Sequence, residues 1–281
     1  MKKYELTDET MTVDGVTYHQ IRACKDFDVQ GYHVKEGDLG GCVESECNID
    51  QDGNAWVSGL ALVRGNARVR GNAHVRGNAW ISDNACVYGN AEVGDNAEVG
   101  DNARVGGNAW VYDDAWVGGN AQICDDAQIC DDAWVGGNAV VRDDALVVGN
   151  ALVSGNAWVS GNAVVGGNAV VGGNARVRGD AVVGGNARVR GDAVVGGNAR
   201  VSKSDHIIVI GPIGSRNDCT TFCRSKDNDI IVKCGCFNGN ISEFLEKVNK
   251  THGDNKYAAE YRAAAEIAKI HIDLSEEGEI E

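Results

Sequence analysis

The sequence predicts a mainly β protein: a parallel β-solenoid with an N-terminal capping hairpin and a small C-terminal α+β domain. The first observation is a six-residue unit, Gly/Asp-Asn/Asp-Ala-x-Val/Ile-x, that repeats through residues 53–202 without an insertion. The second is that residues 1–52 and 203–281 lack this period. A short and strict period indicates stacked structural repeats rather than one globular core.

Residues 1–52 are expected to form an N-terminal β cap. Two strand-like segments, 10–13 and 16–21, flank Asp14-Gly15, a dipeptide typical of two-residue hairpin turns. The open end of a solenoid exposes unpaired backbone groups and apolar side chains. A hairpin at this end would cover them.

The repeat itself, residues 53–202, is expected to form the solenoid. Each unit would be one short strand and one corner, with the Val or Ile and the Ala turned inward. Gly, Asn and Asp suit the corner because its backbone conformations are costly for other residues. Three units would make a coil of eighteen residues, so that every residue lies over the residue eighteen positions along the chain.

The unit Val99-Gly100-Asp101-Asn102-Ala103-Arg104 has an aliphatic-x-x-x-small-x pattern and resembles the hexapeptide-repeat family. The resemblance implies a left-handed parallel β-helix, although right-handed crossovers are the general rule for parallel strands. It also implies self-association, often as a trimer. Acyl transfer from acyl-CoA is the activity most often found with this fold.

Residues 203–281 are expected to form a small α+β domain. Three segments read as strands: 206–210, 219–224 and 230–236. Asn240 and Glu243 form a capping-box pattern at the start of one helix. A second, Ala-rich helix is expected over 255–270, with Asp254 as its N-cap.

Segments of the two flanking regions resemble a group of bacterial and phage hexapeptide-repeat proteins that have no agreed activity. In the C-terminal region these are residues 211–216, 234–237 and 251–257, and in the head they are residues 35–41. The resemblance supports the three-part architecture. It also introduces a phage-type protein that sequesters a small ligand as one functional alternative.

Composition restricts the classes of function. The chain has a formal net charge of −15, and between Asp83 and Asp144 its only basic residues are Arg104 and Arg142. Binding to a nucleic-acid backbone is therefore not expected. There is no apolar run long enough to span a membrane and no visible secretory signal. The ten cysteines then read as reduced thiols of a cytoplasmic protein.

His74 is the one histidine in the repeat and the weak candidate for a catalytic base. It occupies an outward position, and no loop is inserted in the repeat to enclose a substrate. We therefore expect a solvated residue here, and no catalytic residue is assigned. Whether the chain is an enzyme stays open, with an acyl-CoA-dependent acyltransferase as the alternative.

One outward face is expected to be an interface. Residues spaced by whole coils place large apolar side chains along it: Leu62, Trp80, Trp116, Trp134 and Leu152. Such a stripe is uncommon on a soluble monomer, and aromatic anchors are typical of interfaces. We expect a homo-oligomer, with a trimer favoured. Docking of the chain's own terminal domain and simple exposure are the alternatives.

Two sets of residues suggest metal sites. Cys219, Cys223, Cys234 and Cys236 would share one side of a hairpin that turns near Asp227-Asn228, which would suit Zn²⁺. Corner carboxylates such as Asp95, Asp113 and Asp131 stack at coil spacing and would suit Ca²⁺. Buried thiols and ordinary corner residues are the simpler interpretations, and no cofactor is predicted.

The loop 211–216 follows a strand and has the glycines, serine and arginine that suit a phosphate-like anion. A ligand site in the C-terminal domain would draw on the following residues: Gly211, Gly214, Ser215, Arg216, Thr220, Thr221, Arg224 and Lys256. An ordinary turn is the alternative interpretation.

The favoured hypothesis is a non-enzymatic, oligomeric β-helical scaffold that displays the C-terminal domain for recognition of a partner protein or ligand. One alternative is an acyltransferase-like enzyme. The other is a phage-type protein that sequesters a small anionic or nucleotide ligand.

Overall fold

The computed structural model describes residues 2–275. The chain divides into two compact units, Met1–Asp144 and Ala145–Glu281, each of which is described by itself. The division falls within the repeat, where each coil contacts only its neighbours. Met1 and residues 276–281, the last part of the expected terminal domain, lie outside the described residues.

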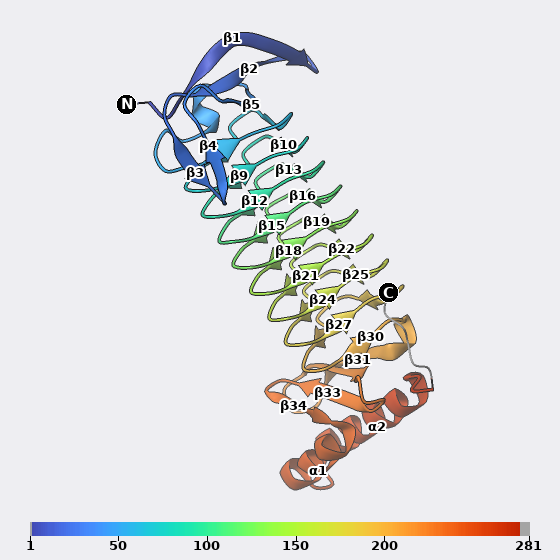
Figure 1. Ribbon diagram of the computed structural model, residues 1–281. Helices are drawn as coiled ribbons and strands as arrows, with labels where there is room; N and C mark the ends of the chain where they lie inside the picture. Colours follow the sequence, from blue (N-terminus) through green and yellow to red (C-terminus); the bar gives the residue numbers. More distant parts are fainter. Residues whose placement is uncertain (1, 276–281) are drawn as a thin grey trace. The chain divides into compact units, whose positions relative to one another are not determined.

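The first unit begins with the predicted hairpin. Strands β1 (Tyr4–Val13) and β2 (Val16–Ala23) pair in antiparallel fashion (Figure 1). The turn residues Asp14 and Gly15 have φ of 51° and 78°, the left-handed conformation that a tight two-residue hairpin requires. A second hairpin, β3 (Phe27–Val29) with β4 (Tyr32–Val34), was not expected from the sequence.

Coil-like pairing starts before the repeat does. Strand β5 (Leu39–Val43) is antiparallel to β2 on one side and parallel to β7 (Leu62–Val63) on the other. After a short 3-10 helix (Glu46–Asn48), the buried Asn48 amide donates hydrogen bonds to two carbonyl oxygens of the next coil. The N-terminal region is therefore continuous with the solenoid, and it covers the exposed strand edges of the first coil.

Each six-residue unit of the repeat contributes one two-residue strand, as predicted. The remaining strands of the first unit are β6 (Trp56–Val57), β8 (Arg68–Val69), β9 (His74–Val75), β10 (Trp80–Ile81), β11 (Cys86–Val87), β12 (Glu92–Val93), β13 (Glu98–Val99), β14 (Arg104–Val105), β15 (Trp110–Val111), β16 (Trp116–Val117), β17 (Gln122–Ile123), β18 (Gln128–Ile129), β19 (Trp134–Val135) and β20 (Val140–Val141). They form three parallel sheets in which residues eighteen positions apart are partners, as in Trp80↔Glu98 and Glu98↔Trp116.

The interior of the coils is made of small apolar side chains. The Ala and the Val or Ile of each unit are fully buried, for example Ala97 and Val99 at 0% exposure. Because every coil repeats the same residues, each side chain packs on a copy of itself one strand spacing away, about 4.8 Å. The inward placement predicted for both positions is confirmed.

Hydrogen bonds between corners add a second layer of stacking. The Asn66 side chain donates to the Asn84 side chain at 3.0 Å, and Asn84 donates to Asn102 at 3.0 Å. The backbone N–H of Asn66 donates to the carbonyl of Asp83 at 2.7 Å. The corner polar groups are therefore satisfied by equivalent residues of the next coil.

The second unit continues the same pattern. Its coil strands are β21 (Leu146–Val147), β22 (Leu152–Val153), β23 (Trp158–Val159), β24 (Val164–Val165), β25 (Val170–Val171), β26 (Arg176–Val177), β27 (Val182–Val183), β28 (Arg188–Val189), β29 (Val194–Val195) and β30 (Arg200–Val201). The eighteen-residue register holds here too, as in Leu152↔Val170.

After the coils comes the predicted α+β domain. A 3-10 helix (Ser204–His206) leads to an antiparallel sheet of β31 (Ile207–Ile213), β32 (Asp218–Arg224), β33 (Ile230–Cys234) and β34 (Phe237–Asn240), followed by α1 (Ile241–His252) and α2 (Lys256–His271). Strand β34 was not expected. Within residues 2–275, no helix is long and apolar enough to cross a membrane.

The helix starts agree with the sequence at α1 and differ at α2. Asn240 and Glu243 form the predicted capping box. At α2 the N-cap is Asn255, whose side chain accepts from two backbone N–H groups, and Asp254 instead pairs with Arg262 at 3.2 Å. The prediction of Asp254 as the cap is wrong by one residue.

The terminal domain also closes the last coil of the second unit. Thr221 of β32 accepts the backbone N–H of Val194 at 3.0 Å, and Lys226 donates its backbone N–H to Asn198. Arg224 is buried and donates to Asn228, with one guanidinium nitrogen 3.3 Å from His206 Nε2. This domain is thus a cap as well, because β32 satisfies backbone groups that the final coils would leave unpaired.

Because the corners stack, the stability lost when a corner glycine is replaced by alanine should depend on whether another coil packs against that corner. Gly173 and Gly191 both have a positive φ, of 68° and 65°. A Cβ at Gly173 would lie 2.8 Å from the backbone nitrogen of Gly191 on the next coil, whereas a Cβ at Gly191 would meet nothing within 4 Å. Gly173→Ala should therefore lower the free energy of unfolding by about 1–3 kcal/mol more than Gly191→Ala. Urea unfolding followed by circular dichroism measures both.

A matched substitution tests the role of corner aspartates. Asp101, with φ of 55°, accepts the N–H of Gly119 on its Oδ2 at 2.7 Å. Gly173→Asp can form the same bond to residue 191 and should be more stable than Gly173→Ala. Equal losses for Gly173→Ala and Gly191→Ala would contradict the stacking argument.

Candidate functional site

The C-terminal domain contains a pocket of about 270 Å³ between α1, the turn after β31 and the turn between β33 and β34. Its polar lining comes from Ser215 and Arg216 in the first turn and from Lys247, Thr251 and His252 on α1. Figure 1 shows α1 lying beside β33 and β34 in this domain.

Two glycines bring pocket side chains against the backbone. Gly214 has φ of 71°, and a Cβ there would overlap the ring of Tyr261. Gly235 has φ of 58°, and a Cβ there would lie 2.8 Å from Arg216 Nε. The missing side chains therefore let the Tyr261 ring and the Arg216 guanidinium occupy the pocket wall. The Gly214 N–H also donates to Glu260 at 2.6 Å, which anchors this turn to α2.

The base of the pocket is aromatic. Phe244 packs against Phe237 and Tyr261, with ring centroids 5.5 and 5.6 Å apart, and His252 lies 5.8 Å from Tyr261. Burial raises the pKa of Tyr261, so its hydroxyl is a hydrogen-bond donor at neutral pH. The pocket therefore combines an apolar base with polar groups at its rim.

The charged groups of this pocket are basic. Arg216, Lys247 and His252 line it, and no carboxylate is among the lining residues. Within residues 2–275, none of these three side chains forms an ion pair with an Asp or Glu. In a chain with a net charge of −15, the two cations Arg216 and Lys247, with the His252 imidazole also in the lining, favour an anionic ligand.

The predicted ligand residues are only partly brought together. Ser215 and Arg216 line the pocket, and Gly214 supports it. Thr220, Thr221 and Arg224 are instead buried in the sheet and at the last coil. Gly211 packs closely against Cys219, and the Lys256 ammonium lies 5.0 Å from the Tyr257 ring.

Sequence reasoning missed the contribution of α1. Lys247 and Thr251 are four residues apart and therefore share one helix face. That spacing was visible in the sequence. The position of this face beside residues 215 and 216 depends on the packing of α1 against the sheet, which no local pattern predicts.

Part of the repeat matches a known protein-family model. A family model described as the YdcK beta-solenoid repeat matches residues 103–119, which span β14 to β16. The same six-residue unit recurs through residues 53–202 and forms parallel coils throughout. The chain is a β-solenoid built from hexapeptide repeats.

Among solved structures, the UDP-N-acetylglucosamine acyltransferase from Campylobacter jejuni is similar to this hexapeptide-repeat protein at 14% identity. The match covers 79% of this chain and 88% of that chain, with a TM-score of 0.24. No protein with curated annotation matches the sequence.

His74 is buried in this hexapeptide-repeat protein, so the expectation of a solvated residue is wrong. It is 5% exposed, the Tyr32 ring stacks on its imidazole at 5.6 Å, and Ser58 Oγ lies 2.8 Å from Nε2. The β3–β4 hairpin, which the sequence did not predict, provides this cover. Burial lowers the His74 pKa, with Glu92 opposing the shift.

The four C-terminal cysteines do not share one side of the sheet, contrary to prediction. Cys234 pairs with Thr220, one residue out of the expected register, whereas Cys223 pairs with Ile231. Since successive residues of a strand face opposite ways, Cys234 lies on the other face from Cys219 and Cys223. Burial raises the pKa of Cys223 to about 12, so this thiol stays protonated.

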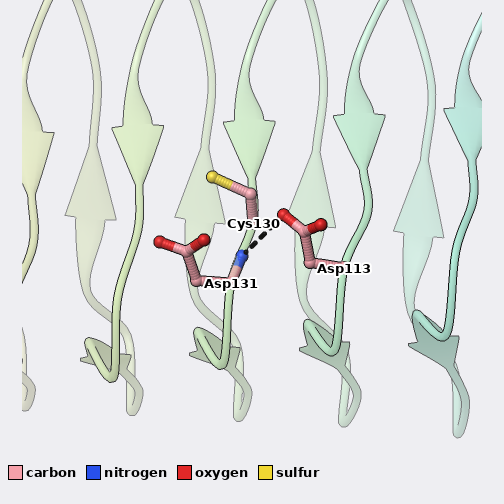
Figure 2. A group of neighbouring side chains, drawn as sticks. All are labelled: Asp113, Cys130 and Asp131. Atoms are coloured by element: carbon pink, nitrogen blue, oxygen red, sulfur yellow. Dashed lines mark hydrogen bonds between the residues drawn. The ribbon is translucent and has the colours of Figure 1, made fainter.

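The corner aspartates stack as predicted, and their carboxylates bond to backbone. Asp113 accepts the N–H of Asp131 at 3.3 Å (Figure 2). In residues 2–275, Asp113, Cys130 and Asp131 are the one group of three or more whose potential ligand atoms lie within 4.8 Å of one another. Burial raises the Cys130 pKa, and a protonated thiol is a poor ligand for a hard cation.

The expected interface residues are partly covered by their own chain. Leu62, Trp80 and Trp116 are half-buried in the first unit, and Leu152 is half-buried in the second. Trp134 remains 38% exposed. Self-association along this face stays a prediction.

The environment of His74 predicts its titration. Because its pKa is lowered in the folded state, the unfolded chain takes up the proton first as the pH falls. The stability that neutral His74 contributes is therefore present above pH 6.5 and declines as the pH drops below it. Histidine NMR, with His74→Gln to assign the signal, should place the His74 midpoint below 6.5. A midpoint at or above 6.5 would contradict the structure.

Proposed function

We propose that this protein is a non-enzymatic scaffold whose β-solenoid presents a C-terminal recognition domain, and that this domain binds a small anion carrying an apolar or aromatic group. The proposal joins the favoured scaffold hypothesis with the ligand-binding alternative. It assigns recognition to the domain and gives the coils a structural role.

One observation carries the proposal: three basic side chains converge on an aromatic-based pocket that has no acidic lining residue. Arginine offers paired N–H donors to phosphate or carboxylate, and lysine adds a point charge. Ser215 and Thr251 add hydroxyl donors at the same rim. A phosphate monoester is the simplest group that satisfies such a set.

The aromatic base of the pocket is the reason for proposing an apolar or aromatic group on the anion. Phe237, Phe244 and Tyr261 offer ring faces and edges below the basic rim. A planar apolar group on the anion would cover these rings and remove them from water. We therefore expect an aromatic phosphate to bind more tightly than inorganic phosphate.

The acyltransferase alternative has less support in the geometry. It depends on His74 as general base, and this imidazole is covered by Tyr32 in the first unit. A general base must reach the proton that it removes.

The proposal predicts binding of phenyl phosphate to the full chain. Isothermal titration calorimetry should detect it, with inorganic phosphate and benzyl alcohol each binding more weakly. Arg216→Ala and Lys247→Ala should each reduce the affinity roughly 10- to 100-fold, since hydrogen bonds to charged groups contribute about 1.5–3 kcal/mol.

Lys250→Ala is the matched control, because Lys250 is an exposed lysine on α1 that does not line the pocket. It should bind phenyl phosphate as the unmodified chain does. An absence of binding by the unmodified chain, or equal losses in Lys247→Ala and Lys250→Ala, would disprove the proposal.

A further inference from the structure

The tryptophan face of the first unit contains a slot of about 290 Å³. Trp80 of β10 and Trp116 of β16 line it, two coils apart. Glu98 and Gly100 of the intervening coil also line it. The slot lies in the first unit and is independent of the anion pocket.

The absence of a side chain at Gly100 opens the slot. The Trp116 ring lies over Gly118 and stacks on Trp134, with centroids 4.7 Å apart and planes at 5°. One face of Trp116 is thereby covered. Because the coils follow in order, its other face looks toward the coil of Glu98, and the position in line with Gly118 on that coil is Gly100.

The coil spacing determines what fits between the two tryptophans. Trp80 pairs with Glu98, and Glu98 pairs with Trp116, so the two tryptophan strands are two strand spacings apart, about 9.5 Å. A cation midway would lie one strand spacing, about 4.8 Å, from each tryptophan strand, which is shorter than the roughly 6 Å over which cation–π attraction acts. A flat guanidinium stacks closely on one ring only, whereas a rounded methylated ammonium group touches both.

The charge of the lining also favours a cation. Asp83, Glu98 and Asp101 contribute three carboxylates, against the single guanidinium of Arg64. That guanidinium already lies 4.9 Å from the centre of the Trp80 ring. The Trp80 ring therefore already contacts one cation of the chain itself.

We propose that this slot is a binding site for a small organic cation, held through a methylated ammonium group between Trp80 and Trp116. Glu98 supplies the nearest countercharge from the central coil. The ligand class follows from three features together: two aromatic walls, an acidic lining and a width of two coils.

Choline is a suitable probe, and 3,3-dimethylbutan-1-ol is its neutral counterpart of the same shape. Calorimetric titration of the full chain should show binding of choline and at least about fivefold weaker binding of the alcohol. Trp116→Leu keeps apolar bulk but loses the aromatic face, and should weaken choline binding about fivefold or more. Trp116→Phe should retain most of the affinity.

Two matched controls separate the slot from general effects. Trp110→Leu removes an exposed tryptophan that does not line the slot, and should bind choline normally. Glu98→Gln should weaken choline binding, whereas Glu246→Gln on α1 makes the same change of charge outside the slot and should not. Circular dichroism checks that every variant is folded.

Three results would overturn the inference. The first is equal binding of choline and the neutral alcohol, and the second is no binding of choline by the unmodified chain. The third concerns self-association: if light scattering shows an oligomer that Trp116→Leu dissociates and Trp110→Leu does not, this face is an interface between copies instead.

Discussion

The structure depends on one packing constraint: the stacking of identical small apolar side chains at a separation of eighteen residues. The inward positions of the coils are filled by alanine, valine and isoleucine, so no inward position carries a polar or ionisable side chain. Whatever recognition this hexapeptide-repeat protein performs must therefore use outward side chains or the capping regions. Both candidate sites follow this division, since one lies on an outward face of the coils and the other in the C-terminal cap.

Features governed by short-range rules were predictable from the sequence. The Asp14-Gly15 hairpin, the Asn240 capping box and the inward Ala and Val positions all follow from local conformational preference or from period. Apart from the N-cap of α2, which was misplaced by one residue, the predictions that were wrong concern features that depend on long-range contacts. The cover over His74 comes from a hairpin more than forty residues earlier in the chain, and the side of the sheet on which Cys234 lies depends on a register that slips easily by one residue. For the same reason, half of the anion pocket was missed, because α1 reaches it only through tertiary packing.

The two candidate sites have opposite charge, but in both of them a glycine provides space for the site. In each, glycine leaves a space that an aromatic or charged neighbour occupies or borders: Gly214 and Gly235 in the basic pocket, and Gly100 in the acidic slot. A Cβ at Gly214 or Gly235 would displace a pocket residue, and at Gly100 it would lie 3.1 Å from Ser82 Oγ. A glycine in a rigid backbone creates a concave surface without disturbing the fold, because main-chain hydrogen bonds already hold the surrounding residues in place.

The eighteen-residue register also restricts how this gene can change in length. Insertion or loss of one six-residue unit leaves the alanine and valine core intact, because every unit is equivalent on its inner side. It nevertheless moves all later outward residues to the neighbouring face. An event of this kind between β10 and β16 would separate Trp80 from Trp116 without a penalty in packing. Only duplications and deletions of three units preserve the alignment, so length variants of this protein that keep the tryptophan pair in line should differ by whole coils.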